Sequence, residues 1–280
     1  MICVSHLSFS QVASSFATGL KFDQRYTKCE RKWVVIPKAD TAKNYVYGYI
    51  YIEHQVFFMF DLRGAFSIGP GGRYVKDTTL YKNIGNLKYR IERNWHPVAL
   101  LPASHFKELD LQPEPSWVKT YYVYRDTARY NYLMGRTYND LNEYEIALTY
   151  LEMARGVNPF TVSVALQMAY AYNMLSRFNE AIAMLQPAIK EKPDDVRLQT
   201  KLGDVYFKLK DYDNALSIYL NAVNLFTYER SEAKGEVAFN IANIFQLQEK
   251  QHGYKIWMLK AKNFTPETSY LYKKIEHAGF

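Results

Sequence analysis

The sequence lacks any apolar run of the about 18 or more residues that a membrane-spanning helix requires, so we expect no integral membrane span. It also lacks a metal-ligand pattern. The six histidines, at positions 6, 54, 96, 105, 252 and 277, have no ligand spacing to one another or to a cysteine. We therefore expect neither a metal site nor a small-molecule cofactor.

Complete catalytic motifs are missing as well. Gly69–Gly72 reads Gly-Pro-Gly-Gly without the Gly-Lys-Ser/Thr ending of a phosphate loop, and it precedes an expected strand, so it predicts a turn. Ser116 and Lys119 match the Ser-x-x-Lys pattern of penicillin-recognising enzymes, but neither the Ser-Asp-Asn nor the Lys-Thr-Gly companion occurs. Asp194 and Asp195 are explained by a helix N-terminus. The sequence predicts a non-enzymatic protein.

The first ten residues, Met1 to Ser10, carry no charge apart from His6 when it is protonated. Ser8 and Ser10 flank Phe9 as small residues flank a signal-peptide cleavage site, which favours a signal remnant over an ordinary frayed terminus. The basic segment and most of the apolar core of such a peptide are missing. Cleavage after Ser10 would leave Cys29 as the one cysteine, which cannot form an internal disulfide.

Residues 21–108 predict a β domain. Tyrosines at 45, 47, 49 and 51 alternate with Val46, Gly48, Ile50 and Ile52, so the tyrosines should line one face of a strand. Trp33–Ile36, Val56–Leu62 and the alternating segment around Leu87–Ile91 predict further strands, and Phe66–Ile68 and Arg73–Val75 flank the Gly69–Gly72 hairpin turn. Five or six strands make a mainly antiparallel sheet or a small sandwich.

Residues 109–127 separate this region from the rest of the chain. Pro113 and Pro115 indicate a linker, and 117–125 fits either a last strand or a helix that caps the next unit. We favour a helix that starts near Ser116, with this serine as its N-cap.

Positive charge is concentrated in the β region. Residues 11–120 contain 16 Lys and Arg against 10 Asp and Glu, whereas 121–280 contain 19 against 18. Basic residues interleaved with aromatics suit an anionic glycan or single-stranded nucleic acid. The alternative is that these basic residues protect strand edges and solvate one face, and the absence of a nucleic-acid motif favours this alternative.

A 34-residue unit then occurs three times in succession, starting at Ala128, Val162 and Val196. Small residues recur at unit positions 8, 20 and 27, tyrosine recurs at 11, and proline fills position 32 in the first two units. Two amphipathic helices per unit would bury their apolar stripes, and the small residues would let neighbouring helices approach. The positions are occupied by Gly135, Ala169 and Gly203 (8), Tyr138, Tyr172 and Tyr206 (11), Ala147, Ala181 and Ala215 (20), Leu151, Leu185 and Tyr219 (24), Ala154, Ala188 and Ala222 (27), and Pro159, Pro193 and Thr227 (32).

A fourth, degenerate unit starts at Gly235, after five extra residues, Arg230–Lys234. Because 229–234 contain no helix breaker, we expect the extra residues to lengthen the preceding helix by more than a turn. Tyr254 replaces the alanine of position 20, so packing there should differ. Residues 269–280, with an amphipathic segment at Tyr270–Ile275, predict a short capping helix for the solenoid.

These repeats resemble the tetratricopeptide repeat (TPR) family over residues 128–268. The resemblance implies an all-α solenoid, which together with the β domain predicted at residues 21–108 makes an α+β two-domain chain. In that family, positions 2, 5, 6, 9, 12 and 13 of each unit face a concave groove that holds peptides. The residues implied as partner-binding are Arg129, Tyr132, Arg136, Asn139, Gln167, Tyr170, Asn173, Arg197, Lys201 and Lys208.

One subclass of the family clamps a C-terminal carboxylate with basic and amide side chains. This chain keeps basic residues at two clamp positions, Arg197 and Lys201, and has Gln167 at a third. It departs at the first pair, where Tyr132 and Arg136 stand in place of lysine and asparagine. That clamp is therefore not expected in its usual form, although a looser acidic-ligand site remains open, as does a groove with no single ligand.

The sequence therefore predicts a non-enzymatic adaptor that binds a peptide or partner protein, with an acidic partner as one possibility. An exported setting (periplasm, envelope or cell surface) is preferred to the cytoplasm because of residues 1–10. Two alternatives stay open. One is a module that binds anionic glycan or nucleic acid through the β domain; the other is an enzyme whose site clusters Glu53, His54, Asp61 or His96.

Overall fold

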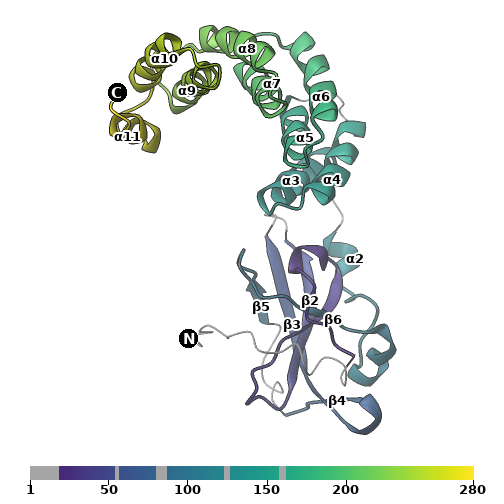
Figure 1. Ribbon diagram of the computed structural model, residues 1–280. Coiled ribbons are helices and arrows are strands. Elements are labelled where there is room, and N and C mark those ends of the chain that lie inside the picture. Colours follow the sequence, from purple (N-terminus) through teal and green to yellow (C-terminus); the bar gives the residue numbers. More distant parts are fainter. Residues whose placement is uncertain (1–18, 54–56, 80–86, 123–126, 158–161) are drawn as a thin grey trace. The chain divides into compact units, whose positions relative to one another are not determined.

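The computed structural model describes residues 19–53, 57–79, 87–122, 127–157 and 162–280. The chain divides into two compact units, Met1–Arg125 and Asp126–Phe280, and each is described by itself (Figure 1). The expected signal remnant, Met1–Ser10, lies outside the described residues.

The first unit is built on one antiparallel sheet. Its described strands follow the order β4-β3-β2-β1-β6, and β5 also pairs with β3. The strands are β1 (Lys32–Ile36), β2 (Tyr45–Ile52), β3 (Phe58–Ile68), β4 (Tyr74–Lys76), β5 (Leu87–Arg90) and β6 (Ala99–Leu100).

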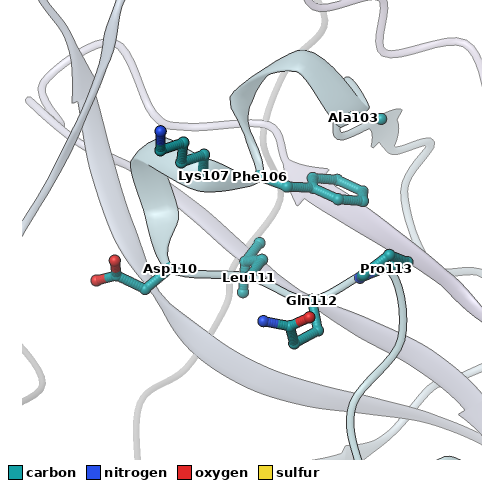
Figure 2. Close-up of a pocket in the computed structure, with 7 residues that line it drawn as sticks. All are labelled: Ala103, Phe106, Lys107, Asp110, Leu111, Gln112 and Pro113. Carbon is teal, nitrogen blue, oxygen red and sulfur yellow. The ribbon is translucent and has the colours of Figure 1, made fainter.

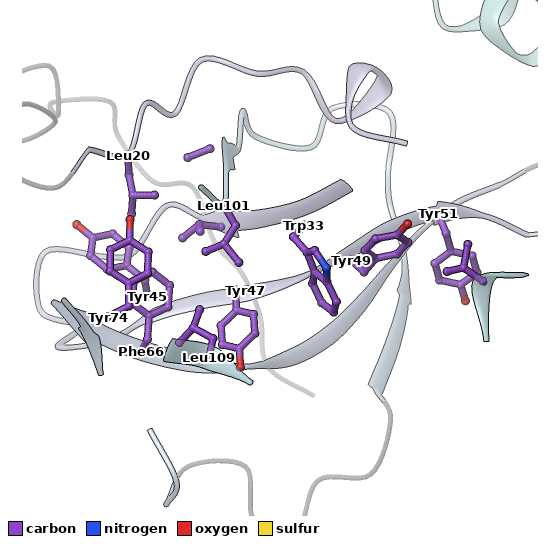
Figure 3. Close-up of a cluster of buried hydrophobic side chains, with 13 residues drawn as sticks. Leu20, Trp33, Tyr45, Tyr47, Tyr49, Tyr51, Phe66, Tyr74, Leu101 and Leu109 are labelled. Carbon is purple, nitrogen blue, oxygen red and sulfur yellow. The ribbon is translucent and has the colours of Figure 1, made fainter. Parts of the chain in front are cut away.

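The tyrosines of β2 form the centre of the core. Their exposed fractions run from 0% at Tyr49 to 9% at Tyr45, so the predicted tyrosine face is buried (Figure 3). Trp33 meets Tyr49 edge-on with ring centroids 5.0 Å apart, and Tyr45 stacks on Phe66 at 5.6 Å. These side chains make the core of the unit, so they do not form the binding surface that the glycan or nucleic-acid alternative required.

Strand β3 joins two segments that we predicted as separate strands. Gly48 of β2 lies opposite Leu62, and Tyr47 lies opposite Gly64, so Arg63 is the extra residue of a β-bulge. The bulge lets one long strand continue to Ile68 and form the predicted hairpin with β4.

Strand β5 lies at the edge of the sheet, paired with the Met59–Leu62 part of β3. The alternation of Leu87, Tyr89 and Ile91 with charged residues predicts one apolar face for this strand. Ile91 is buried, but Tyr89 is 49% exposed, so this face of the strand is only partly covered.

Residues 109–122 pack with the sheet, which differs from the expected linker. Leu109 and Val118 are buried in the tyrosine core, and Trp117 packs against it. A short helix, α2 (Val118–Tyr121), begins after Trp117, and Ser116 does not cap it. Apolar side chains at 109, 117 and 118 outweigh the two prolines that indicated a linker.

The second unit consists of antiparallel helix pairs. Among the described residues, α3 and α4 form the first repeat, α5 and α6 the second, α7 and α8 the third, and α9 and α10 the fourth (Figure 1). The helices are α3 (Thr127–Asp140), α4 (Tyr144–Val157), α5 (Val162–Met174), α6 (Phe178–Glu191), α7 (Val196–Lys208), α8 (Tyr212–Leu225), α9 (Glu232–Leu247), α10 (Gln251–Phe264) and α11 (Tyr270–His277).

The same turn joins the two helices of every repeat. The residue at unit position 15 is left-handed in all four units, with φ between 58° and 62°. The next N–H donates to the carbonyl of position 11, which ends the first helix in a Schellman motif. The left-handed residues are Asn142, Ser176, Lys210 and Glu249. The fourth repeat therefore keeps the register of the other three.

Small residues at position 8 face the larger residue at position 24 of the same repeat. A side chain on Gly135 would overlap Leu151, and one on Gly203 would come within 2.6 Å of the Tyr219 ring. In the first and third repeats the two helices are thus held close by the absence of a Cβ, as the spacing predicted.

The five extra residues before the fourth repeat do not lengthen the preceding helix, contrary to our expectation. Helix α8 ends at Leu225, and Ser231 then caps α9 by accepting a hydrogen bond from the Lys234 N–H at 3.1 Å. The extra residues form a loop and the first turn of α9. The sequence has no helix breaker here, but the Ser231 N-cap is sufficient to begin a new helix.

The last helix closes the array. Leu271 and Ile275 of α11 are buried with Ala242 and Met258 of the fourth repeat. The predicted capping helix is therefore present. In the fourth repeat Tyr254 is only partly buried, and Gly253 beside it packs against the Phe245 ring.

Candidate protein-binding face

We call the side chains at positions 2, 5, 6, 9, 12 and 13 of α3, α5, α7 and α9 the first-helix face. Four of the ten predicted residues are exposed, and five are partly exposed. Asn139 alone is buried, at 1% exposure. The exposed residues are Arg129, Arg136, Arg197 and Lys208; the partly exposed residues are Tyr132, Gln167, Tyr170, Asn173 and Lys201.

Asn139 and Gln167 bind each other across the first two repeats. The Asn139 Nδ2 donates to the Gln167 main-chain oxygen at 3.0 Å and to Gln167 Oε1 at 2.9 Å. Sequence reasoning treated both as partner contacts. The buried Asn139 instead holds Gln167, which is the more exposed of the two.

Two predicted basic residues are paired with carboxylates that lie two or three residues away in the sequence. Arg197 forks onto Asp195, with Nη2 2.6 Å from Oδ2, and this bond holds the Asp195 pKa below its usual range. Lys201 Nζ lies 3.0 Å from Asp204 Oδ2. Arg136 has no ion pair within the described part of the chain.

Asp204 joins the third repeat to the fourth. Its Oδ1 accepts a 2.7 Å hydrogen bond from the Tyr219 hydroxyl, which in turn lies 3.4 Å from Asn240 Nδ2. Burial and then Asp204 raise the pKa of Tyr219, so the hydroxyl stays a donor. The sequence analysis did not predict Asn240 as a residue of this face, although Asn240 occupies position 6 of the fourth unit.

Glu236, at position 2 of the fourth repeat, was also missed. Burial raises its pKa, the negative charges of Glu232 and Asp204 add to the rise, and Lys201 opposes it. The first-helix face therefore carries carboxylates beside Lys201, which the predicted basic residues did not suggest.

Contacts between repeats bring several of the predicted side chains together. Lys201 Nζ lies 5.9 Å from the centre of the Tyr170 ring, which meets Tyr144 edge-on at 6.0 Å. Tyr132 of the first repeat is close enough to Arg197 of the third to add to the rise of its pKa, after the larger effect of Asp195. Residues far apart in sequence thus share one face.

Among the described residues of the enzyme alternative, Asp61 and His96 lie on opposite faces of the sheet. Asp61 and Phe60 are successive residues of β3 and point to opposite faces. Phe60 contacts Trp95, and the His96 ring lies tilted against Trp95 with centroids 4.6 Å apart, so His96 lies on the face away from Asp61. His54 lies outside the described residues. Burial raises the pKa of the Cys29 thiol to about 11, so the thiol stays protonated at neutral pH.

The buried carboxyl of Asp61 predicts how the stability of the β unit depends on pH. Its side chain is fully buried, and its Oδ2 accepts from Arg63 Nη2 at 2.6 Å. Burial raises the Asp61 pKa although Arg63 and Lys88 act in the opposite direction. Between the unfolded and the folded pKa the folded state holds more protons, so stability is lost as pH rises through that interval.

We expect the Asp61→Asn variant to gain stability relative to the native chain over this interval, by about 1.4 kcal/mol per pKa unit. Three of the four tryptophans, Trp33, Trp95 and Trp117, lie in the β unit and would report its urea unfolding. Unfolding curves from acid to neutral pH check the prediction. A difference that stays constant or shrinks as pH rises would contradict it.

An open hollow of about 670 Å³ lies on the β unit (Figure 2). Most of its lining is apolar, and its Asp110 pairs with Lys76 at 3.0 Å. None of the predicted site residues lines it. Within the described residues, no helix is long and apolar enough to cross a membrane, and no group of three His, Cys, Asp or Glu could hold a metal ion.

Comparison with known proteins identifies the helical unit. Two tetratricopeptide repeat family models match, one over residues 128–159 and the other over 166–227. Neither match reaches the β unit. The paired helices define a helical repeat protein, and the helical unit contains tetratricopeptide repeats over these residues. Such repeats serve protein–protein interaction, so the chain is a protein-binding adaptor of a class that is typically non-enzymatic.

Solved structures with similar folds cover about half of the chain. MamA residues 41–end from Desulfovibrio magneticus RS-1 align with a TM-score of 0.44 and 14% identity, over 54% of this chain and 76% of that one. TTC0263, a thermophilic TPR protein from Thermus thermophilus, aligns with a TM-score of 0.47 and 19% identity, over 54% and 80%. No curated protein matches the sequence.

Proposed function

We propose that the first-helix face is a groove that receives an extended or helical segment of another protein. The observation that supports this is the set of contacts between repeats. Asn139 binds Gln167 of the second repeat, and Lys201 of the third repeat lies over Tyr170 of the second. Amide, aromatic and basic groups from successive helices therefore share one face, as peptide recognition requires.

The mechanism is recognition by a surface that already exists. Residues at position 8 and the left-handed turns fix the helix pairs before any partner arrives. Binding then avoids much of the ordering cost that a disordered receptor would meet. The predicted residues supply hydrogen bonds and a few aromatic anchors.

An acidic partner is supported by only part of the basic set. Arg136 and Lys208 are exposed on the face, whereas Arg197 and Lys201 already meet Asp195 and Asp204. The proposed centre of an acidic site therefore moves from the third repeat towards the first two.

The test is a pull-down with the full chain from an envelope extract of its own source. It runs beside an Arg136, Arg197 and Lys201 triple alanine variant. A matched control replaces Lys190, Lys255 and Lys273, exposed lysines of α6, α10 and α11, and removes the same charge elsewhere. We expect one partner that the native chain and the control capture and the triple variant loses. Equal capture by all three would contradict the groove.

The proposal includes an exported setting, which is supported by the small residues around Phe9. Mass spectrometry of the protein purified from its source should find Gln11 as the first residue. A chain that retains residues 1–10 and fractionates with the cytoplasm would contradict export.

A further inference from the structure

We propose that Asn139 is a positioning residue, which turns the Gln167 side chain so that the second repeat presents an N–H donor to the partner. The partner group that fits is an oxygen acceptor, either a carboxylate or a main-chain carbonyl, and an ammonium group is rejected. This inference rests on the proposed function, because it assumes that the first-helix face meets the partner.

The orientation of Asn139 follows from a fixed neighbour. The main-chain oxygen of Gln167 can only accept hydrogen bonds, and one end of the Asn139 amide lies 3.0 Å from it. That end must be the Nδ2 amide, because an oxygen there would face another oxygen. The Asn139 Oδ1 is left buried without a partner, so this orientation is kept at a cost.

The orientation of Gln167 follows in turn. The same Nδ2 lies 2.9 Å from the end of the Gln167 amide, and a donor there must meet an acceptor. Oε1 therefore points towards Asn139, and Nε2 is the end left for other partners. Within the described part of the chain Nε2 donates no hydrogen bond, and Gln167 is partly exposed.

Burial makes Asn139 a positioning residue and not a contact. At 1% exposure it is the most deeply buried of the ten predicted residues, so a partner meets Gln167 and not Asn139. Arg136, exposed on the same face without an ion pair in the described residues, adds positive charge that favours an acceptor oxygen. At position 6 of the second repeat, Gln167 thus presents its Nε2 donor, and Asn139 of the first repeat fixes this orientation.

The first test needs no partner. In a nuclear magnetic resonance spectrum of the full chain, the Asn139 side-chain amide protons should exchange slowly with solvent and those of Gln167 quickly. Asn139→Ala should change the Gln167 side-chain resonances. Slow exchange at Gln167, or no change in the variant, would overturn the inference.

The second test uses peptides selected on the full chain from a random displayed library. Gln167→Glu keeps the size and the acceptor that faces Asn139, but places an oxygen where Nε2 was. We expect it to weaken binding about tenfold or more, and Asn139→Ala to weaken it less. Gln186→Glu, at an exposed position of α6, makes the same charge change away from the face and should leave affinity unchanged.

The outcomes separate the two proposals. If the selected peptides bind Arg136→Ala with the same affinity as the native chain, the result would contradict the proposed groove itself. Peptides that depend on Arg136 but bind Gln167→Glu and Asn139→Ala as well as the native chain would overturn only the role of Asn139. Replacing each Asp or Glu of a selected peptide with its amide identifies the acceptor: a loss indicates a carboxylate, and retained binding indicates a main-chain carbonyl.

Discussion

Replacing Tyr219 with alanine is expected to lower the unfolding free energy of the helical unit by about 3–5 kcal/mol. Tyr219 is 1% exposed and belongs to the core between the third and fourth repeats. Its ring fills the space beside Gly203, and its hydroxyl donates to Asp204 at 2.7 Å. Alanine would leave a cavity and also remove a hydrogen bond to a charged group. Urea unfolding followed by far-ultraviolet circular dichroism, to which the helices contribute most, measures the effect.

A pair of variants shows whether the loss comes from packing. The second repeat has alanine at position 8 and leucine at 24, where the third has Gly203 and Tyr219. Gly203→Ala and Tyr219→Leu should each destabilise the chain, but the double variant should lose less than the sum. Additive losses would show that the ring and the glycine do not depend on each other. Tyr219→Phe isolates the hydroxyl and should cost about 1.5–3 kcal/mol.

Gly48→Ala is expected to destabilise the β unit by about 3 kcal/mol, the upper end for overpacking. A Cβ at Gly48 would lie 2.5 Å from the main-chain oxygen of Asp61 and 2.5 Å from the Phe60 ring. The oxygen belongs to the neighbouring strand, so no side-chain rotation relieves the overlap. Tryptophan fluorescence follows unfolding, since three of the four tryptophans lie in this unit.

Gly156→Ala provides the matched control. Gly156 lies in α4, and a Cβ there would meet no atom within 4 Å. Alanine should stabilise the helical unit by about 0.4–1 kcal/mol, because it restricts the unfolded chain. If Gly48→Ala were as harmless as this control, the close approach of β2 and β3 would not constrain the sheet.

The repeat architecture could be predicted because its signals are local and recur. Gly135, Ala169 and Gly203 stand at one position of three equal units, and the two glycines let the helices of their repeats approach closely. The start of α9 could not be predicted in the same way. It depends on Ser231, one serine among several polar residues, whose capping bond is visible only in the structure.

In the β region, alternation showed that Tyr45–Tyr51 share a face but not what covers it. The cover includes Leu109 and Val118, which come from a segment with the prolines of a linker. A pattern within one strand carries no information about a distant segment. The long β3 was missed for a similar reason, because the bulge at Arg63 breaks the alternation on which a strand prediction relies.

On the first-helix face, repeat positions predicted which residues share a surface but not how they pair. Arg197 and Lys201 look like free cations in the sequence, yet Asp195 and Asp204 meet them. Asn139 looks like a partner contact, yet it is buried against Gln167. Pairing depends on side-chain distances of a few ångströms, which a positional match does not contain.

The left-handed turn of each repeat also shows where the helical unit could be stabilised. Ser176, Lys210 and Glu249 hold a conformation that favours glycine, at a cost of about 1 kcal/mol each. Glycine at these three corners would raise thermal tolerance in separate steps, because a solenoid adds the stabilities of its units. The corners are not positions of the first-helix face, so an engineer could tune durability and recognition independently. The natural sequence keeps less stable residues at these turns. This is common, because selection requires sufficient and not maximal stability.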